Sequence, residues 1–167
     1  NVYISKRYEI PETTPDMLNS KEMVQAQQAW RDYGNKGEGM VIGIIDSGID
    51  PNHKDMVLTD SSTAKLDEAT VNSLIEELGL PGKYYSEKIP YGYNYADNNQ
   101  NIIDRNPETD AHGMHVAGIS AANGDEENGG IKGVAPEAQL LALRVFPEVG
   151  RYTYADIFVR AIDDAIA

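Results

Sequence analysis

Hydrophobic and polar positions along the chain predict strands and helices in alternation. Three short runs of branched or aromatic residues, bounded by Gly, Pro or Asp, predict buried strands. These runs are residues 40–45, 90–95 and 139–145. Four segments carry apolar or small residues at helical spacing and predict helices. They are residues 20–33, 66–78, 112–122 and 154–167.

Strands that alternate with helices predict a parallel sheet covered on both faces, so we expect an α/β fold, a three-layer α/β/α sandwich with a mostly parallel sheet. Residues 1–19 are polar and contain two prolines, which predicts an N-terminal arm before a domain of residues 20–167. Ser20 is the expected N-cap of the first helix, with Met23, Ala26 and Trp30 on one face.

The chain has the features of a piece of a larger domain. Asn1 is an unusual first residue, and residues 163–167 still have a helical pattern. We therefore expect the sheet to be incomplete in this chain. Its open edge and uncovered apolar faces predict low stability without a partner chain.

Composition narrows the classes of function. The 167 residues carry a formal net charge of −13, and 41% of them are hydrophobic. Nucleic-acid binding needs clustered Lys and Arg, so an acidic chain argues against such a partner. The sequence contains no cysteine, and no apolar run has the length of a membrane span.

The first candidate site is Asp46, which directly follows a predicted buried strand and precedes a glycine turn in residues 44–49 (IIDSGI). Sites in parallel α/β sheets are built at the carboxyl ends of strands. A partly desolvated Asp at such a place can orient a histidine and stabilise its charged form. The alternative is that Asp46 only caps a turn, as many aspartates do.

The second candidate site is His112, the first residue of a predicted helix in residues 112–118 (HGMHVAG). Histidine is the side chain that ordinarily exchanges its proton near neutral pH, which suits it to general acid–base catalysis. The spacing His112-x-x-His115 also leaves a metal hypothesis open, because residues three apart share a helix face. Zinc hydrolases more often have His at i and i+4 with a Glu between them, so His115 is interpreted as a structural hydrogen-bonding residue.

Together these motifs resemble those of the subtilases, the subtilisin-like serine proteases. Residues 44–49 are similar to the aspartate motif and residues 112–118 to the histidine motif, and residues 133–138 (GVAPEA) match the segment that follows. The order of acid before base also agrees with subtilisin. The resemblance implies a subtilisin-like fold, with Asp46 and His112 as the acid and base of a catalytic triad.

A narrower resemblance is to the large cell-envelope proteinases of Gram-positive bacteria, the lactocepin and C5a-peptidase group. Met114 stands where many subtilases have Thr. The number of residues between Asp46 and His112 is about twice that in the smallest members of the family. This resemblance implies an extracellular or cell-wall location and large polypeptide substrates.

The family's serine nucleophile and oxyanion-hole asparagine have no counterpart in these 167 residues. Ser47 lies beside Asp46 but matches a small hydroxyl position of the aspartate motif, not a nucleophile. The resemblance therefore places the nucleophile in the remainder of the catalytic domain, which is an expected partner. A triad without its serine keeps only a residual rate, so this polypeptide alone is expected to be inactive.

The resemblance also implies where substrate binds. Residues Gly150, Arg151 and Tyr152 fall where subtilases present an edge strand to the substrate backbone, and Tyr154 is placed to line a pocket. Binding there would be strand addition, with main-chain hydrogen bonds supplying affinity. The alternative is that residues 147–153 form only a loop before the last helix.

No cofactor is required for this chemistry, although structural calcium is a possibility because many subtilases bind it. One candidate is the acidic loop of residues 124–130. The other is Asp97 with Glu108, which resembles an EF-hand loop but has Ile102 where that loop needs glycine.

Two other functions share these motifs. One is a non-catalytic, protease-like binding module. The other is a metal-dependent hydrolase that uses Asp46, His112 and His115.

Overall fold

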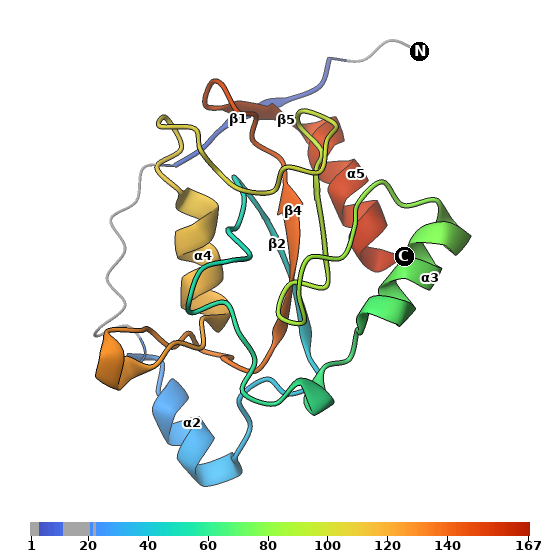
Figure 1. Ribbon diagram of the computed structural model, residues 1–167. Helices are drawn as coiled ribbons and strands as arrows, with labels where there is room; N and C mark the ends of the chain where they lie inside the picture. Colours follow the sequence, from blue (N-terminus) through green and yellow to red (C-terminus); the bar gives the residue numbers. More distant parts are fainter. Residues whose placement is uncertain (1–3, 12–20, 22) are drawn as a thin grey trace.

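A computed structural model describes residues 4–11, 21 and 23–167. Its main sheet has three parallel strands in the order β2-β4-β3. The strands are β2 (Val41–Asp46), β4 (Gln139–Arg144) and β3 (Tyr91–Asn94). Figure 1 shows α4 (His112–Ala121) on one side of this sheet and α5 (Ala155–Ile166) with α3 (Glu68–Leu78) on the other. The expected three-layer α/β/α arrangement is confirmed.

Alternate residues of β4 explain the layers, because successive side chains of a strand point to opposite faces. Leu140 and Ala142 belong to the core beneath α4, whereas Leu141 and Leu143 belong to the core beneath α3 and α5. All six residues of β4 are buried. A central strand buried on both faces needs a continuous apolar run, which is why the sequence pattern identified it.

Helix ends follow local chemistry. The Asp67 side chain accepts a hydrogen bond from the Thr70 amide at 2.8 Å and caps α3, so that helix begins at Glu68. The helix expected over residues 20–33 is interrupted: residues 21 and 23 are helical, residues 24 and 25 form a turn in which Gln25 has a left-handed φ of 58°, and α2 (Ala26–Tyr33) follows. Of the face expected to be buried, Ala26 is buried and Met23 is 83% exposed. Ser20, the expected cap, lies outside the described residues.

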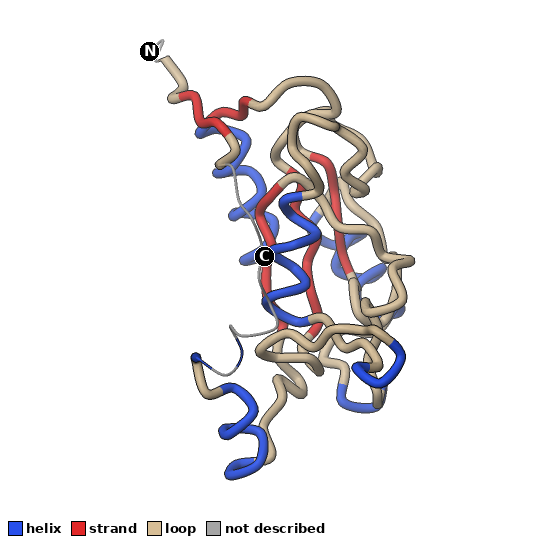
Figure 2. The backbone as a smooth tube through the Cα atoms, turned by 90° about the vertical axis from the view of Figure 1, so that its left-hand side faces the viewer, coloured by secondary structure: helices blue, strands red, loops and turns tan. Residues whose placement is uncertain are grey.

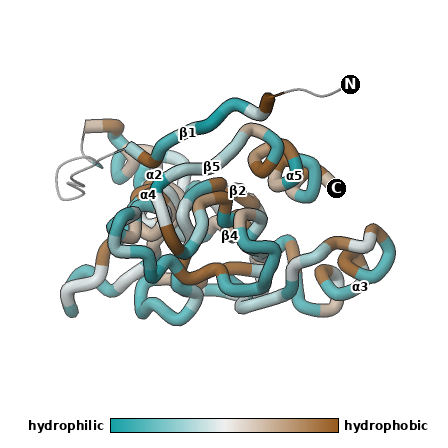
Figure 3. Tube along the Cα trace, turned by 90° about the horizontal axis from the view of Figure 1, so that it is seen from above, coloured by the Kyte–Doolittle hydropathy of each residue, from teal (hydrophilic) through white to brown (hydrophobic). Residues whose placement is uncertain are grey.

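A second, two-stranded sheet joins the two ends of the chain. In it β1 (Arg7–Glu9) pairs antiparallel with β5 (Tyr152–Tyr154). Figure 2 shows this pair apart from the main sheet, at one end of the molecule. Figure 3 shows that β1 is largely hydrophilic, whereas hydrophobic residues gather in β2 and on part of α5.

Two smaller structures complete the described elements, the 3-10 turns η1 (Ser61–Thr63) and η2 (Glu126–Asn128). In the part of the chain that the structure describes, no helix combines the length and hydrophobicity needed to cross a bilayer.

Lys88 is a fully buried cation between these elements. Its Nζ donates to the carbonyl oxygens of Pro136 and Ala138, each at 2.6 Å. Burial lowers the pKa of Lys88 to about 8. The ammonium ties the segment before β3 to the segment before β4.

Candidate active site

Asp46 and His112 meet at the carboxyl end of the sheet. Asp46 is the last residue of β2, and His112 is the first residue of α4. The His112 Nδ1 lies 2.8 Å from Asp46 Oδ1 and 2.9 Å from Oδ2. Both side chains are nearly buried, at 11% and 13% exposure.

This contact defines the state of the imidazole. An ionised carboxylate can only accept hydrogen bonds, so Nδ1 must carry a proton and donate it. In the neutral ring Nε2 is then the acceptor, free to take a proton from another group. The pair thus has the geometry of a general base held in one tautomer by an acid.

Ser47 connects the two elements from behind. The Ser47 amide donates to Asp46 Oδ1 at 2.7 Å, which fixes the carboxylate. Its Oγ accepts a hydrogen bond from the Gly113 amide at 2.9 Å, which anchors the start of α4. Ser47 is completely buried, so its hydroxyl serves the structure and is not presented to a substrate.

Two glycines permit close packing around the turn that follows β2. Gly48 has a φ of 130°, and a Cβ there would lie 2.3 Å from the Ile102 carbonyl oxygen. A Cβ on Gly113 would lie 2.6 Å from the Gly48 carbonyl oxygen. A larger residue at Gly113 would push the start of α4 away from the turn after β2, whereas one at Gly48 would meet residues 102–104.

The metal hypothesis finds no support in the geometry. Among residues 4–11, 21 and 23–167, no three His, Asp or Glu side chains are arranged to hold a metal ion. His115 instead lines a separate pocket of about 310 Å³ together with His53, Asp55 and Met56. Asp46, His112 and His115 therefore do not form a common site.

The expected substrate residues lie at the start of β5 and are already paired. Tyr152 opens β5, opposite Glu9 of β1, and the Arg151 carbonyl oxygen accepts a hydrogen bond from the Ile10 amide at 3.1 Å. Gly150 has a φ of 94°, and its carbonyl oxygen accepts from Asn106 Nδ2 at 2.7 Å. Of the three expected residues, only Tyr152 lies in a strand, and the chain's own N-terminal segment pairs with that strand.

The acidic loop after α4, the first calcium candidate, is held by hydrogen bonds within the chain. Its neighbour Asp55 is buried, and the carboxylate of Asp55 accepts from Lys54 Nζ at 2.9 Å and from the Ile131 amide at 3.1 Å. Lys54 Nζ also donates to the Gly129 carbonyl oxygen at 3.1 Å. In the loop itself, Asp125 accepts from the Glu127 amide at 3.0 Å and from Asn128. The chain's own ammonium and amides thus contact the carboxylates of Asp55 and Asp125.

In the second calcium candidate, too, a carboxylate is bonded within the chain. Asp97 Oδ2 accepts from Asn94 Nδ2 at 2.9 Å and from the Glu148 amide at 3.0 Å. The guanidinium of Arg144 lies within 3.8 Å of Glu148 and donates to the Asn101 carbonyl oxygen at 3.3 Å. A positive charge is therefore already present among these oxygens.

Sequence reasoning did not identify Ser47 as the link to α4, nor Asn106 as a contact of the β4–β5 loop. The only signal for Asn106 was the Asn-Pro dipeptide at 106–107, which is typical of a turn. Neither residue has a pattern that reveals its distant partner.

An acid that orients a histidine at the carboxyl ends of parallel strands is the arrangement found in hydrolases with a serine triad. Residues 37–167 match the subtilase family, peptidase S8, and the chain belongs to this family.

Its relatives include bacterial proteinases. The PI-type proteinase of Lactococcus lactis subsp. cremoris is 44% identical over 155 residues, which are 90% of this chain and 8% of that protein. The C5a peptidase of Streptococcus pyogenes serotype M3 is 29% identical, over 97% of this chain and 14% of that protein. The chain thus spans a small part of these relatives. Both proteins belong to the group that the sequence resembled, so the narrower resemblance is confirmed.

A solved structure supports the fold. The Clostridium perfringens CspB protease superposes with a TM-score of 0.57 at 21% identity, covering 88% of this chain and 30% of that chain.

Proposed function

We propose that these residues form the acid–base part of the catalytic domain of a serine endopeptidase. The observation that carries the proposal is the hydrogen bond from His112 Nδ1 to Asp46, which leaves Nε2 as the proton acceptor. Family membership supports the same assignment, because the two residues occupy the aspartate and histidine motifs.

In the proposed reaction a serine from the remainder of the domain attacks the substrate carbonyl carbon. His112 Nε2 takes the serine proton as the bond from Oγ to carbon forms. His112 then delivers this proton to the leaving amine nitrogen as the carbon–nitrogen bond breaks, and water releases the acyl group by the reverse route. Asp46 stabilises the imidazolium in both steps. These proton transfers balance without a metal or an organic cofactor.

Polypeptide substrates would bind by strand addition to residues 150–152. The N-terminal segment supports this proposal, since Glu9 lies antiparallel to Tyr152 and the Ile10 amide donates to the Arg151 carbonyl oxygen. A substrate strand would replace β1. The oxyanion-hole asparagine would come, like the serine, from the remainder of the domain. The proteinase relatives support an extracellular or cell-wall location.

A fluorophosphonate probe tests the proposal, because it modifies only an activated serine. The full-length polypeptide is treated with the probe, and its mass is measured under denaturing conditions with the wild-type residue and with His112→Ala. We expect one label on the wild type and a labelling rate lower by at least about 10³-fold in H112A. An unlabelled wild type would support a non-catalytic binding module instead.

A further inference from the structure

The segment that presents His112 has a strained backbone. Asp110 and Ala111, the two residues before α4, have φ values of 49° and 51°. Two consecutive non-glycine residues in the left-handed region are uncommon and persist only where neighbouring contacts hold them. The placement of His112 therefore depends on what fixes residues 104–111.

Asn106 is central to the hydrogen bonds of this segment. Its side-chain Oδ1 accepts from the Glu108 main-chain amide at 2.9 Å. Its main-chain amide donates to Asp104 Oδ1 at 3.0 Å. Its main-chain carbonyl oxygen accepts from the Thr109 amide at 3.2 Å, while the Thr109 hydroxyl donates to the Asp104 carboxylate at 2.7 Å. The Thr109 carbonyl oxygen in turn accepts from the His112 amide at 3.0 Å. Two hydrogen-bonded steps thus join Asn106 to the first residue of α4.

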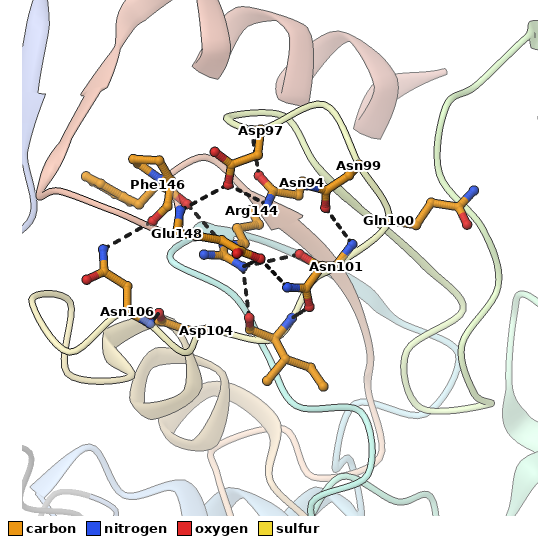
Figure 4. Close-up of polar contacts among 12 residues, drawn as sticks. Asn94, Asp97, Asn99, Gln100, Asn101, Asp104, Asn106, Arg144, Phe146 and Glu148 are labelled. Carbon is orange, nitrogen blue, oxygen red and sulfur yellow. Dashed lines mark hydrogen bonds and ion pairs between the residues drawn. The ribbon is translucent and has the colours of Figure 1, made fainter.

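The other end of the Asn106 side chain holds the loop between β4 and β5. Its Nδ2 donates to the carbonyl oxygens of Pro147 at 3.2 Å and Gly150 at 2.7 Å. Figure 4 shows Asn106 reaching this loop beside Phe146. Asn106 is only 3% exposed, so the bonds are shielded from water. One amide group therefore contacts the segment before His112 and the segment before the proposed substrate edge.

Arg144 fixes the frame around this contact. It is completely buried, and its Nε donates to the Phe146 carbonyl oxygen at 3.0 Å. Its Nη1 donates to the Ile103 carbonyl oxygen at 2.8 Å. Figure 4 places the arginine between these two loops. With both loops anchored at this side, Asn106 is the residue that connects their far ends.

We propose that Asn106 is a positioning residue that couples occupancy of the edge at Gly150 to the placement of the base His112. This inference rests on the proposed function of the two sites. A peptide strand that pairs with residues 150–152 orders the Gly150 carbonyl, which orders the Asn106 amide and, through it, the turn before His112. Extended substrates then benefit from Asn106 more than short ones do.

An asparagine suits this task because its side chain accepts on one side and donates twice on the other. An ionised aspartate would direct an oxygen at two carbonyl oxygens and repel them. A protonated aspartate would restore one of the two donors. Buried against two carbonyls, this carboxyl has a raised pKa, so protonation returns within a mildly acidic range. The titratable residues Asp104 and Glu108 also face the segment. They are present in the wild type and in an N106D variant alike, so their titration affects both proteins.

The test compares the active enzyme that contains these residues with its Asn106→Ala and Asn106→Asp variants. The matched control is Asn72→Asp, an exposed asparagine on α3. Both kcat and KM are measured for an extended peptide and for a single-residue ester. We expect N106A to lower kcat/KM about tenfold for the peptide and less for the ester. We expect the ratio of N106D to wild-type activity to rise on acidification, while the ratios for N106A and N72D stay constant.

Equal losses on peptide and ester with a flat N106D ratio would overturn the coupling, as would N106 variants that behave like N72D. If N106A does not fold, the N106D ratio decides alone.

Hydrogen exchange separates this inference from the proposed function. Loss of the Asn106 side chain should speed exchange at the His112 amide and also at the Ile10 amide, which reports on the 150–152 edge. Faster exchange at only one of the two would overturn the coupling. A wild-type enzyme that neither hydrolyses peptides nor takes the probe would refute the proposed function and leave the exchange result standing.

Discussion

Replacement of the buried Lys88 by Met should change how the stability of the protein depends on pH. The ammonium of Lys88 lies in the interior, where it donates to the carbonyl oxygens of Pro136 and Ala138. Burial disfavours the charged form, and the nearby Glu137 offsets this only in part, so the pKa falls to about 8. In the unfolded chain the same group has its ordinary pKa of 10.5.

The magnitude follows from this difference in pKa. Between pH 8 and 10.5 the unfolded state binds more protons than the folded state, so stability rises with pH. At about 1.4 kcal/mol per pH unit the gain across this window is about 3 kcal/mol. Below pH 8 the whole penalty is present. Burial raises the pKa of Tyr85 to about 12, which lowers stability only above pH 10 and equally in both proteins.

Chemical unfolding at intervals from pH 7 to 10.5 measures this effect for the wild type, K88M and the exposed control Lys65→Met. At pH 7, K88M avoids the cost of burying a charged ammonium, but the carbonyl oxygens of Pro136 and Ala138 lose their donor. These two effects oppose each other, so the stabilities of K88M and the wild type differ little at pH 7. Between pH 8 and 10.5 the free energy of unfolding of the wild type should rise by about 3 kcal/mol relative to that of K88M. Parallel curves for the two proteins would refute the reasoning, and K65M should follow the wild type throughout.

Three further predictions concern the site. Asp46→Asn replaces the carboxylate with a group that can favour the wrong imidazole tautomer; kcat of the active enzyme should fall by about 10⁴-fold, and a fall below tenfold would contradict the assigned role. Ile10→Pro removes the amide that donates to Arg151 and so weakens the cover on the proposed edge. KM for an extended peptide should fall about 2- to 10-fold, whereas an unchanged KM would mean that β1 does not compete with substrate. Ser47→Ala leaves the Gly113 amide without its acceptor, which should cost about 1–3 kcal/mol in the free energy of unfolding. A thermal midpoint equal to that of the wild type would contradict this role.

The sequence predicted the elements whose stability comes from burial. β4 was found because an apolar run reveals a strand enclosed on both faces, and β2 has a similar run although only Ile44 in it is buried. β1 was not found, because all three of its residues are exposed and its pairing with β5 depends on a partner far along the chain. α5 begins at Ala155, one residue later than expected, because Tyr154 remains in the strand.

The candidate site divides in the same way. Asp46 and His112 were predicted because each stands at a recognisable place, the end of a strand and the start of a helix. The contact from Ser47 to Gly113 and the contacts of Asn106 were not predicted, since a hydrogen bond between distant polar residues leaves no periodic trace in the sequence. The occupied state of the 150–152 edge needed the three-dimensional pairing as well.

The pairing of the two chain ends has a consequence for the order of folding. Beside the β1–β5 pair, the Asp156 amide donates to Ser5 Oγ at 3.4 Å, and these residues are 151 positions apart. Contacts of such long range form late, because the loop between them must close first. During synthesis the segment around Ser5 leaves the ribosome long before its partner exists. The first described strand of the chain is therefore among the last to be paired, and it remains accessible to other molecules until the rest of the domain has folded.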